Sequence, residues 1–146
     1  MARLAMVIPT YNEAAHISDL LRALAALPEP PILIVVDDAS PDGTATLAEA
    51  EAMRLPGIRV IRRAQGKGGR GGACVEGFRA ALETQSDLIG EMDGDFYHEP
   101  ADLARLVAAL RSAGADFVIG SRYLPGGAPQ GWPLRRHVFS RLANRF

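Results

Sequence analysis

Two aspartates separated by one glycine, Asp93 and Asp95, follow a short apolar run at residues 88–90. In a strand, residues two positions apart point to the same side, so both carboxylates could face one ligand. Two hard oxygen ligands suit Mg²⁺ or Mn²⁺, particularly when phosphate oxygens complete the coordination shell. Asp-Gly is also a common turn dipeptide, so these residues alone are equally compatible with a solvated acidic turn.

A second acidic pair, Asp37 and Asp38, ends an unbroken apolar run at residues 32–36. Two adjacent carboxylates at the end of a buried strand are costly unless they bind something. One of them could accept hydrogen bonds from a ribose or a base. The other interpretation is helix capping and turn formation together with Asp42, and the two roles are compatible.

A glycine-rich segment at residues 66–71 has the spacing G-x-G-x-x-G. The dinucleotide-binding fingerprint lies in the first strand–helix turn, whereas this segment follows the third expected strand. A Walker A loop is excluded because Gly68 follows Lys67 where Ser or Thr is required. Two interpretations stay open: a loop whose Lys67 and Arg70 meet phosphates, or a plain mobile loop.

Short apolar runs alternate with helical patterns through the 146 residues. We expect strands at residues 4–8, 32–36, 58–61, 87–92 and 117–120, and helices at residues 13–26, 44–53, 73–83, 100–110 and 134–146. Asn12 is the expected N-cap of the first helix, and Gly114 is expected to end the fourth. This alternation predicts one α/β domain, residues 1–146, with a mainly parallel sheet.

The polar motifs fall at one edge of that predicted sheet. In parallel α/β sheets, ligands bind beyond the carboxyl ends of the strands. Polar residues directly follow the expected strands, among them Tyr11, Asp37, Asp93 and Arg122. The sequence therefore predicts one ligand site, built from several loops.

The charge distribution points to an anionic partner at the C-terminal end. The last thirty residues carry five arginines and no acidic residue, although the net charge of the chain is −1. The whole-chain charge gives no indication of nucleic acid binding. Within residues 134–146 the apolar side chains share one helical face. We expect this basic amphipathic helix either to lie on an anionic membrane surface or to pack on protein.

The cysteine content and the hydropathy suggest a compartment. Cys74 is the only cysteine, so no internal disulfide forms and a reducing environment fits best. No apolar run approaches the ~20 residues that span a bilayer, and no signal-peptide pattern is seen at the start. We expect a cytoplasmic protein, peripheral at the cytoplasmic face of a membrane.

Three motifs in register resemble family 2 glycosyltransferases of the GT-A fold: residues 7–13 (VIPTYNE), 35–44 (VVDDASPDGT) and 92–95 (MDGD). Residues 120–123 (GSRY) and an arginine pair further on resemble the polyprenol-phosphate (dolichol-phosphate) mannosyltransferase group within that family. The resemblance implies a Rossmann-like, three-layer αβα fold with a mainly parallel central sheet. Because that family continues past this point with another strand, we expect the C-terminal part of the catalytic domain to be missing.

The resemblance also implies a role for each matching position. The donor nucleotide would be bound by Pro9, Tyr11, Glu13, Asp37, Asp38, Lys67 and Asp93. Mg²⁺ or Mn²⁺ would be held by Asp93 and Asp95, which form the implied catalytic set together with Arg122. The acceptor phosphate would be bound by Arg122, Arg135 and Arg136, whose planar guanidinium groups pair bidentately with phosphates.

The implied function is inverting transfer of a hexose to a polyprenyl or dolichyl phosphate, with mannose from GDP-mannose as the favoured donor. A phosphate acceptor is already anionic, so the enzyme needs to align the reactants and stabilise the departing diphosphate. One alternative is UDP-glucose or another nucleotide sugar with the same acceptor. The other is a non-catalytic module that binds nucleotide sugars or docks at a membrane. Expected partners are the donor, the acceptor, the membrane surface, and a membrane protein or the missing C-terminal segment.

Overall fold

The structure, a computed structural model, describes residues 3–64, 68–121, 135, 139–140 and 143. The chain divides into two compact units, Met1–Leu103 and Ala104–Phe146. The described residues contain strands and helices in strict alternation: β1 (Leu4–Thr10), α1 (Ile17–Ala25), β2 (Ile32–Asp37), α2 (Thr44–Ala52), β3 (Ile58–Arg62), α3 (Gly69–Leu82), β4 (Leu88–Glu91) and α4 (Asp102–Ala113).

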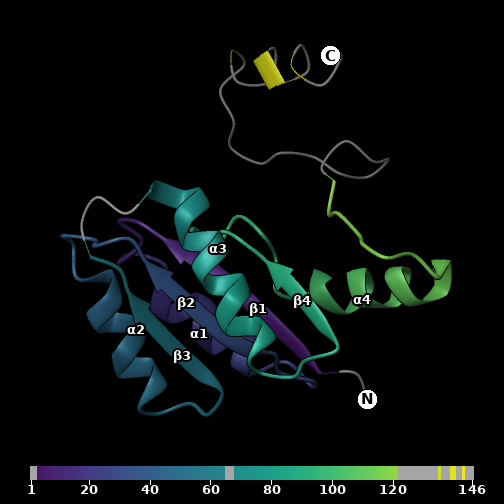
Figure 1. The fold of residues 1–146 in the computed structure, drawn as a ribbon, viewed down its shortest axis with the longest axis horizontal. Helices are drawn as coiled ribbons and strands as arrows, with labels where there is room; N and C mark the ends of the chain where they lie inside the picture. Colours follow the sequence, from purple (N-terminus) through teal and green to yellow (C-terminus); the bar gives the residue numbers. More distant parts are fainter. Residues whose placement is uncertain (1–2, 65–67, 122–134, 136–138, 141–142, 144–146) are drawn as a thin grey trace. The chain divides into compact units, whose positions relative to one another are not determined.

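The four strands of the first unit form one parallel sheet in the order β3-β2-β1-β4. The chain builds outward from β1 to β3 and then crosses back to add β4 on the other side of β1 (Figure 1). The direction of strand addition therefore reverses at β1. Such a reversal leaves a crevice at the carboxyl ends of the two strands that flank it.

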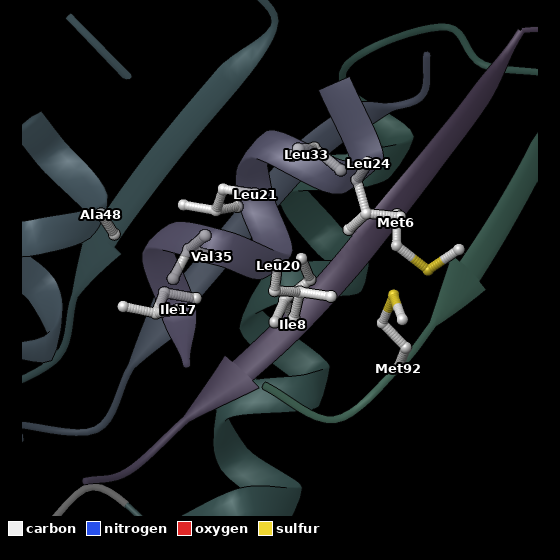
Figure 2. Packing of buried hydrophobic residues seen from close by; sticks show 10 residues of the cluster. All are labelled: Met6, Ile8, Ile17, Leu20, Leu21, Leu24, Leu33, Val35, Ala48 and Met92. Carbon is white, nitrogen blue, oxygen red and sulfur yellow. The ribbon is translucent and has the colours of Figure 1, made fainter. Parts of the chain in front are cut away.

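Helices α1 and α2 cover one face of this sheet and α3 covers the other, which confirms the α/β, Rossmann-like prediction (Figure 1). On one face, the apolar side of α1 packs on Met6, Ile8 and Val35 (Figure 2). On the other face, the alternate strand residues, such as Val7 and Val36, pack with alanines of α3. Alternate residues of a strand point to opposite faces, so a continuous apolar run supplies both cores at once.

α3 approaches the sheet so closely that one of its positions has no room for a side chain. A Cβ atom at Gly77 would lie 2.3 Å from Val7 Cγ1 and 3.1 Å from Val36 Cγ2. The buried residues of α3 are otherwise alanines. Small residues on this face therefore allow α3 to lie close to the sheet.

β1 continues through Pro9 to Thr10, two residues further than expected. Thr10 O accepts a hydrogen bond from Asp38 N on the β2 side, whereas Val7 O accepts one from Met92 N on the β4 side. Pro9 lies two residues after Val7, so its backbone is directed to the same side of the strand. The N–H that proline lacks would therefore point toward β4. Pairing with β4 ends at Val7, and the proline therefore costs no ladder bond.

The starts of two helices differ from the expected ones. α1 begins at Ile17, and Asn12 does not cap it: Asn12 has left-handed backbone (φ 61°), and residues 13–16 form a turn before the helix. α3 begins at Gly69, within the segment expected to be a loop, with Gly68 as its N-cap (φ 105°). Packing on the sheet and the anchored N-terminus of α3 outweigh the low helix propensity of its glycines.

In the second unit, α4 ends before Gly114, which has φ 57°, as expected. The expected strand at residues 117–120 is wrong: these residues are not extended in any ladder. A strand needs a partner for its hydrogen bonds, and none is present for this segment among the described residues. Of the expected helix at 134–146, the described residues 135, 139–140 and 143 are helical.

Among the described residues, no helix combines the length and the hydropathy that crossing a bilayer requires.

Substituting two glycines of α3 tests the close approach of this helix to the sheet. We expect Gly77→Ala to lower the free energy of unfolding by about 1–2 kcal/mol, because overpacking outweighs the gain in helix propensity. Gly71→Ala is the matched control, since nothing lies within 4 Å of a Cβ atom there. We expect it to raise the free energy by about 0.5–1 kcal/mol. Urea unfolding measures both, and equal effects would contradict the packing argument.

Candidate functional site

A pocket of about 540 Å³ lies at the carboxyl ends of β1, β2 and β4, beside the N-terminus of α3. It is therefore located at the crevice where the strand order reverses. The described residues that line it all belong to the first unit: Pro9, Thr10, Tyr11, Glu13, Asp38, Gly69, Arg70, Ala73, Asp93, Gly94 and Asp95.

Three successive backbone N–H groups hold the loop after β1 in place. Asn12 N donates to Ser40 Oγ (3.0 Å), Glu13 N to Thr44 Oγ1 (2.9 Å) and Ala14 N to Asp42 Oδ2 (3.0 Å). The three acceptors come from residues 40–44, which comprise the end of the β2–α2 loop and the first residue of α2. The side chains of this segment thus position the wall of the pocket that carries Glu13.

Asp37 is buried beneath this arrangement, with 2% of its surface exposed. Its carboxylate accepts hydrogen bonds from Thr10 Oγ1 (3.1 Å), from Ser40 N (2.9 Å) and from Ser40 Oγ. These bonds join the end of β1 to the β2–α2 loop and compensate the buried charge. Asp37 is absent from the pocket lining, so the structure gives it a structural task, and its predicted contact with a nucleotide stays a prediction.

Asp38, the next residue, lines the pocket and pairs with the buried guanidinium of Arg63 (2.5 Å). Arg63 also binds Glu76 of α3 (3.1 Å) and the carbonyl oxygen of Gly69 (3.1 Å). Only 3% of the Arg63 side chain is exposed. One buried cation therefore fixes the end of β2, the side of α3 and the first residue of that helix to one another.

The acidic segment after β4 is arranged differently from a strand. β4 ends at Glu91, and Asp93, Gly94 and Asp95 belong to the turn that follows. Glu91 and Asp93, two residues apart, share the guanidinium of Arg70. Asp95 reaches the same pocket through the turn, where its Oδ1 accepts a hydrogen bond from Tyr97 N (3.1 Å). Asp93, and not Asp95, therefore shares a counter-ion with Glu91.

Gly94 lets this turn lie directly on the end of β1. A Cβ atom at this position would be 2.9 Å from Thr10 Cγ2 and 3.3 Å from Glu13 Cγ. The two aspartates are therefore held against the loop that carries Glu13. The glycine between them is therefore required for this close packing.

Glu13 and Asp95 keep an uncompensated negative charge in this pocket. Among the described residues, neither pairs with an arginine or a lysine. Burial, and next the charge of Asp95, raise the pKa of Glu13, and Asp93 adds to the effect. Unbalanced oxygen ligands around one pocket are the electrostatic setting that a divalent cation relieves.

The donor set fits a cation that shares its shell with a ligand. No group of three metal-binding side chains is preformed in the part of the chain that the structure describes. Asp93 and Asp95 supply two carboxylates to the pocket, which leaves the other coordination positions to water or phosphate oxygens. Mg²⁺ and Mn²⁺ favour such mixed shells of few carboxylates and phosphate oxygens.

Cys74, on α3, lies in the electrostatic field of this cluster but is not an activated thiol. Burial, and next the charge of Glu91, raise the pKa of the thiol above its ordinary 9.0. At neutral pH it therefore stays protonated, and thiolate chemistry is not expected.

The structure brings together seven of the residues singled out in the sequence, namely Pro9, Tyr11, Glu13, Asp38, Arg70, Asp93 and Asp95. It does not describe Lys67, Arg122 or Arg136, and Arg135 belongs to the second unit. Thr10, Gly69 and Ala73 also line the pocket and were not predicted. Arg70 had a signal, the glycine-rich segment before a helix, but its pairing with Asp93 required the tertiary structure.

Comparisons with known proteins agree with this arrangement. The family described as Glycosyl transferase family 2 matches residues 5–146. An undecaprenyl-phosphate mannosyltransferase of Micrococcus luteus is 46% identical over 139 residues, which are 94% of this chain and 56% of the relative. A polyprenol monophosphomannose synthase of Mycolicibacterium smegmatis is 43% identical, over 99% of this chain and 54% of the relative. The chain thus spans about half the length of these two curated relatives.

One solved structure is similar in fold as well as in sequence. A mannosyltransferase from Pyrobaculum calidifontis, in complex with GDP-Man and Mn²⁺, matches with a TM-score of 0.60 at 25% identity. The match covers 75% of this chain and 32% of that protein. The shared fold is the parallel sheet with its flanking helices.

The raised pKa of Glu13 predicts a pH-dependent effect on stability. A carboxyl group whose pKa rises on folding destabilises the fold when it is ionised, and this cost disappears below its ordinary pKa of 4.5. In EDTA at pH 7 we therefore expect Glu13→Gln to raise the Tm by about 1–3 °C. The difference should fall to nothing below pH 4.5.

The control for this measurement is Glu29→Gln, because Glu29 is exposed in the loop before β2. We expect no change of Tm in that variant at either pH. A Tm gain of Glu13→Gln that persists at low pH would show that packing, and not charge, is responsible.

Proposed function

Because this chain belongs to the glycosyl transferase family 2, we propose that its pocket binds a nucleotide-sugar donor with a divalent cation, as part of an enzyme that transfers mannose from GDP-mannose to a polyprenyl phosphate. The observation that carries the proposal is the gathering of Asp93, Asp95 and Glu13 in one pocket at the reversal of the strand order. The names of the two curated relatives support the acceptor class and the sugar.

The donor would lie along the carboxyl edge of β1 and β2, over Pro9, Tyr11 and Asp38. The Tyr11 side chain is 59% exposed at the rim of the pocket, where its ring can cover a base. The diphosphate would lie toward the first turn of α3, because the N–H groups of a helix start favour anions. Gly69 leaves the backbone of this turn accessible, since nothing lies within 4 Å of a Cβ atom there.

Asp93 and Asp95 would hold Mg²⁺ or Mn²⁺ against the diphosphate. When bound, the cation supplies Lewis-acid stabilisation of the charge on the leaving nucleoside diphosphate. The carboxylates themselves neither give nor take a proton in this proposal. Their task is to fix the leaving group while Glu13 adds negative charge that strengthens cation binding.

In the proposed reaction, an oxygen of the acceptor phosphate attacks the anomeric carbon from the side opposite the diphosphate. The new C–O bond forms as the bond to the diphosphate breaks, and the configuration at this carbon inverts. The bonding electron pair leaves with the nucleoside diphosphate. No proton has to move, because the acceptor oxygen is already ionised.

The acceptor would be bound by Arg122, Arg135 and Arg136. The basic segment that contains them carries no acidic residue, so it can meet both an acceptor phosphate and an anionic membrane surface. We therefore propose that the enzyme works as a peripheral protein at the cytoplasmic face of a membrane.

The direct test is transfer of radiolabelled sugar to a polyprenyl phosphate by the full-length protein, with Mn²⁺ present. Labelled lipid formed from GDP-mannose supports the proposal. Labelled lipid formed only from UDP-glucose would mean that the donor is UDP-glucose and not GDP-mannose. Binding of GDP-mannose without formation of any labelled lipid would leave a binding module instead of an enzyme.

The cation assignment predicts the behaviour of Asp95→Asn. We expect its Kd for GDP, measured by calorimetry, to be the same in Mn²⁺ as in EDTA, because the amide cannot replace the charged ligand. Circular dichroism should show an unchanged fold. The matched control is Asp19→Asn on α1, an exposed position outside the pocket lining, where the Mn²⁺ effect should persist. An Mn²⁺ effect of wild-type size in Asp95→Asn would disprove the assignment.

The proposed acceptor site predicts that a variant of its arginines changes the KM values of the two substrates differently. We expect the double variant Arg135→Ala, Arg136→Ala to raise the KM for polyprenyl phosphate by about tenfold or more, with the KM for GDP-mannose little changed. Arg111→Ala, which removes an exposed arginine of α4, serves as the charge control. Equal increases in both KM values would indicate a structural role for the pair.

A further inference from the structure

Arg70 is paired with Asp93, one of the two carboxylates that the proposed cation would bind. Its Nη2 lies 2.6 Å from Asp93 Oδ1 and 2.6 Å from Glu91 Oε1, and its Nε lies 3.2 Å from the same Asp93 oxygen. Pairing with Asp93 is the main reason why the pKa of Arg70 is raised. A guanidinium and a divalent cation cannot both hold Asp93 Oδ1 in this geometry.

The two arginines beside the pocket differ in how firmly they are held. The Arg63 side chain is 3% exposed and contacts Asp38, Glu76 and the Gly69 carbonyl, so it is part of the core of the site. The Arg70 side chain is 60% exposed and its two carboxylate partners are accessible to solvent. Exposed ion pairs are worth little and exchange readily. Arg70 can therefore leave Asp93 without disturbing the fold.

From its position at the start of α3, the Arg70 side chain can also reach a ligand in the pocket. It is the second residue of α3, and both Arg70 and Gly69 line the pocket. Arg63 anchors the Gly69 carbonyl, so the backbone stays in place while the long Arg70 side chain turns. A diphosphate at this end of the pocket would offer oxygens that pair bidentately with the guanidinium.

On the basis of the function proposed above, we propose that Arg70 is an exchangeable counter-ion, which pairs with Asp93 and Glu91 in the empty pocket and moves to the donor diphosphate when the divalent cation takes Asp93. The cation alone must displace Arg70 from Asp93, which costs the guanidinium one of its two carboxylate partners and leaves it with Glu91. Diphosphate replaces the partner that is lost. Cation and diphosphate therefore bind with positive coupling, and each raises the affinity for the other by the same factor.

The test uses the variant Arg70→Gln, with Mn²⁺ and inorganic diphosphate as probes. Electron paramagnetic resonance of the free Mn²⁺ ion gives the affinity for Mn²⁺ with and without diphosphate. We expect Arg70→Gln to bind Mn²⁺ alone about three- to tenfold more tightly than the wild type. We expect the factor by which diphosphate tightens Mn²⁺ binding to fall by a similar amount.

The control is Arg59→Gln, which removes an equally charged exposed side chain paired with Glu83, outside the pocket lining. Both constants should stay at wild-type values there. If Arg70→Gln binds Mn²⁺ no more tightly than the wild type, the exchange does not occur. If Mn²⁺ affinity rises but the coupling factor is unchanged, Arg70 only repels the cation, and the proposal fails.

These probes separate this proposal from the function on which it rests. Neither Mn²⁺ nor inorganic diphosphate contains a base or a sugar, so the result for Arg70 does not depend on the donor. Failure of sugar transfer with the exchange intact would overturn the mannosyltransferase proposal alone. Transfer without any change of coupling in Arg70→Gln would overturn only the exchange.

Discussion

The concentration of carboxylates at one end of a parallel sheet is the constraint on which the rest of the site depends. The strands β1, β2 and β4 and their loops bring acidic side chains to the same edge: Glu13, Asp37, Asp38, Asp42, Glu91, Asp93 and Asp95. Like charges this close repel one another and lose hydration. A stable fold requires that most of them be compensated.

The structure compensates them in three ways. Hydroxyl and backbone N–H donors hold Asp37 and Asp42: although burial acts to raise it, hydrogen bonds from Thr44 and from Ala14 N–H lower the pKa of Asp42. The buried Arg63 neutralises Asp38 and ties it to α3. The exposed Arg70 pairs with both Glu91 and Asp93, so that its single charge offsets one of the two. The first two arrangements are built into the fold, whereas the third is accessible to exchange.

The carboxylates that are not compensated in these three ways explain the chemistry that we propose. Glu13 and Asp95 have no arginine or lysine partner among the described residues, so the pocket keeps a local negative charge. A divalent cation relieves that charge and simultaneously attracts a diphosphate. The same feature that weakens the isolated fold thus creates affinity for the donor, in line with the tendency of binding sites to store unfavourable electrostatics.

Much of the fold followed from sequence pattern. Apolar runs and helical periodicity gave four of the five expected strands to within about two residues, because burial on both faces leaves a continuous apolar signal. The strand expected at residues 117–120 has the same apolar character, but pairing depends on a partner strand and not on its own residues. Asn12 has the right chemistry for an N-cap, yet its backbone N–H is bound to Ser40, a contact between loops that are distant in the sequence.

Residue patterns along the chain were enough to predict the αβ alternation, the carboxyl edge as the site of the ligand, and the acidic residues that gather there. They were enough because strand direction and side-chain type are local properties. The tertiary structure alone decided which carboxylates are already neutralised. Asp37 and Asp38 are adjacent in sequence, but one is buried under Ser40 and the other faces the pocket beside Arg63. Asp93 and Asp95 likewise look equivalent, and only packing of α3 places Arg70 on the first and leaves the second open, because charge pairing is set by distance in space.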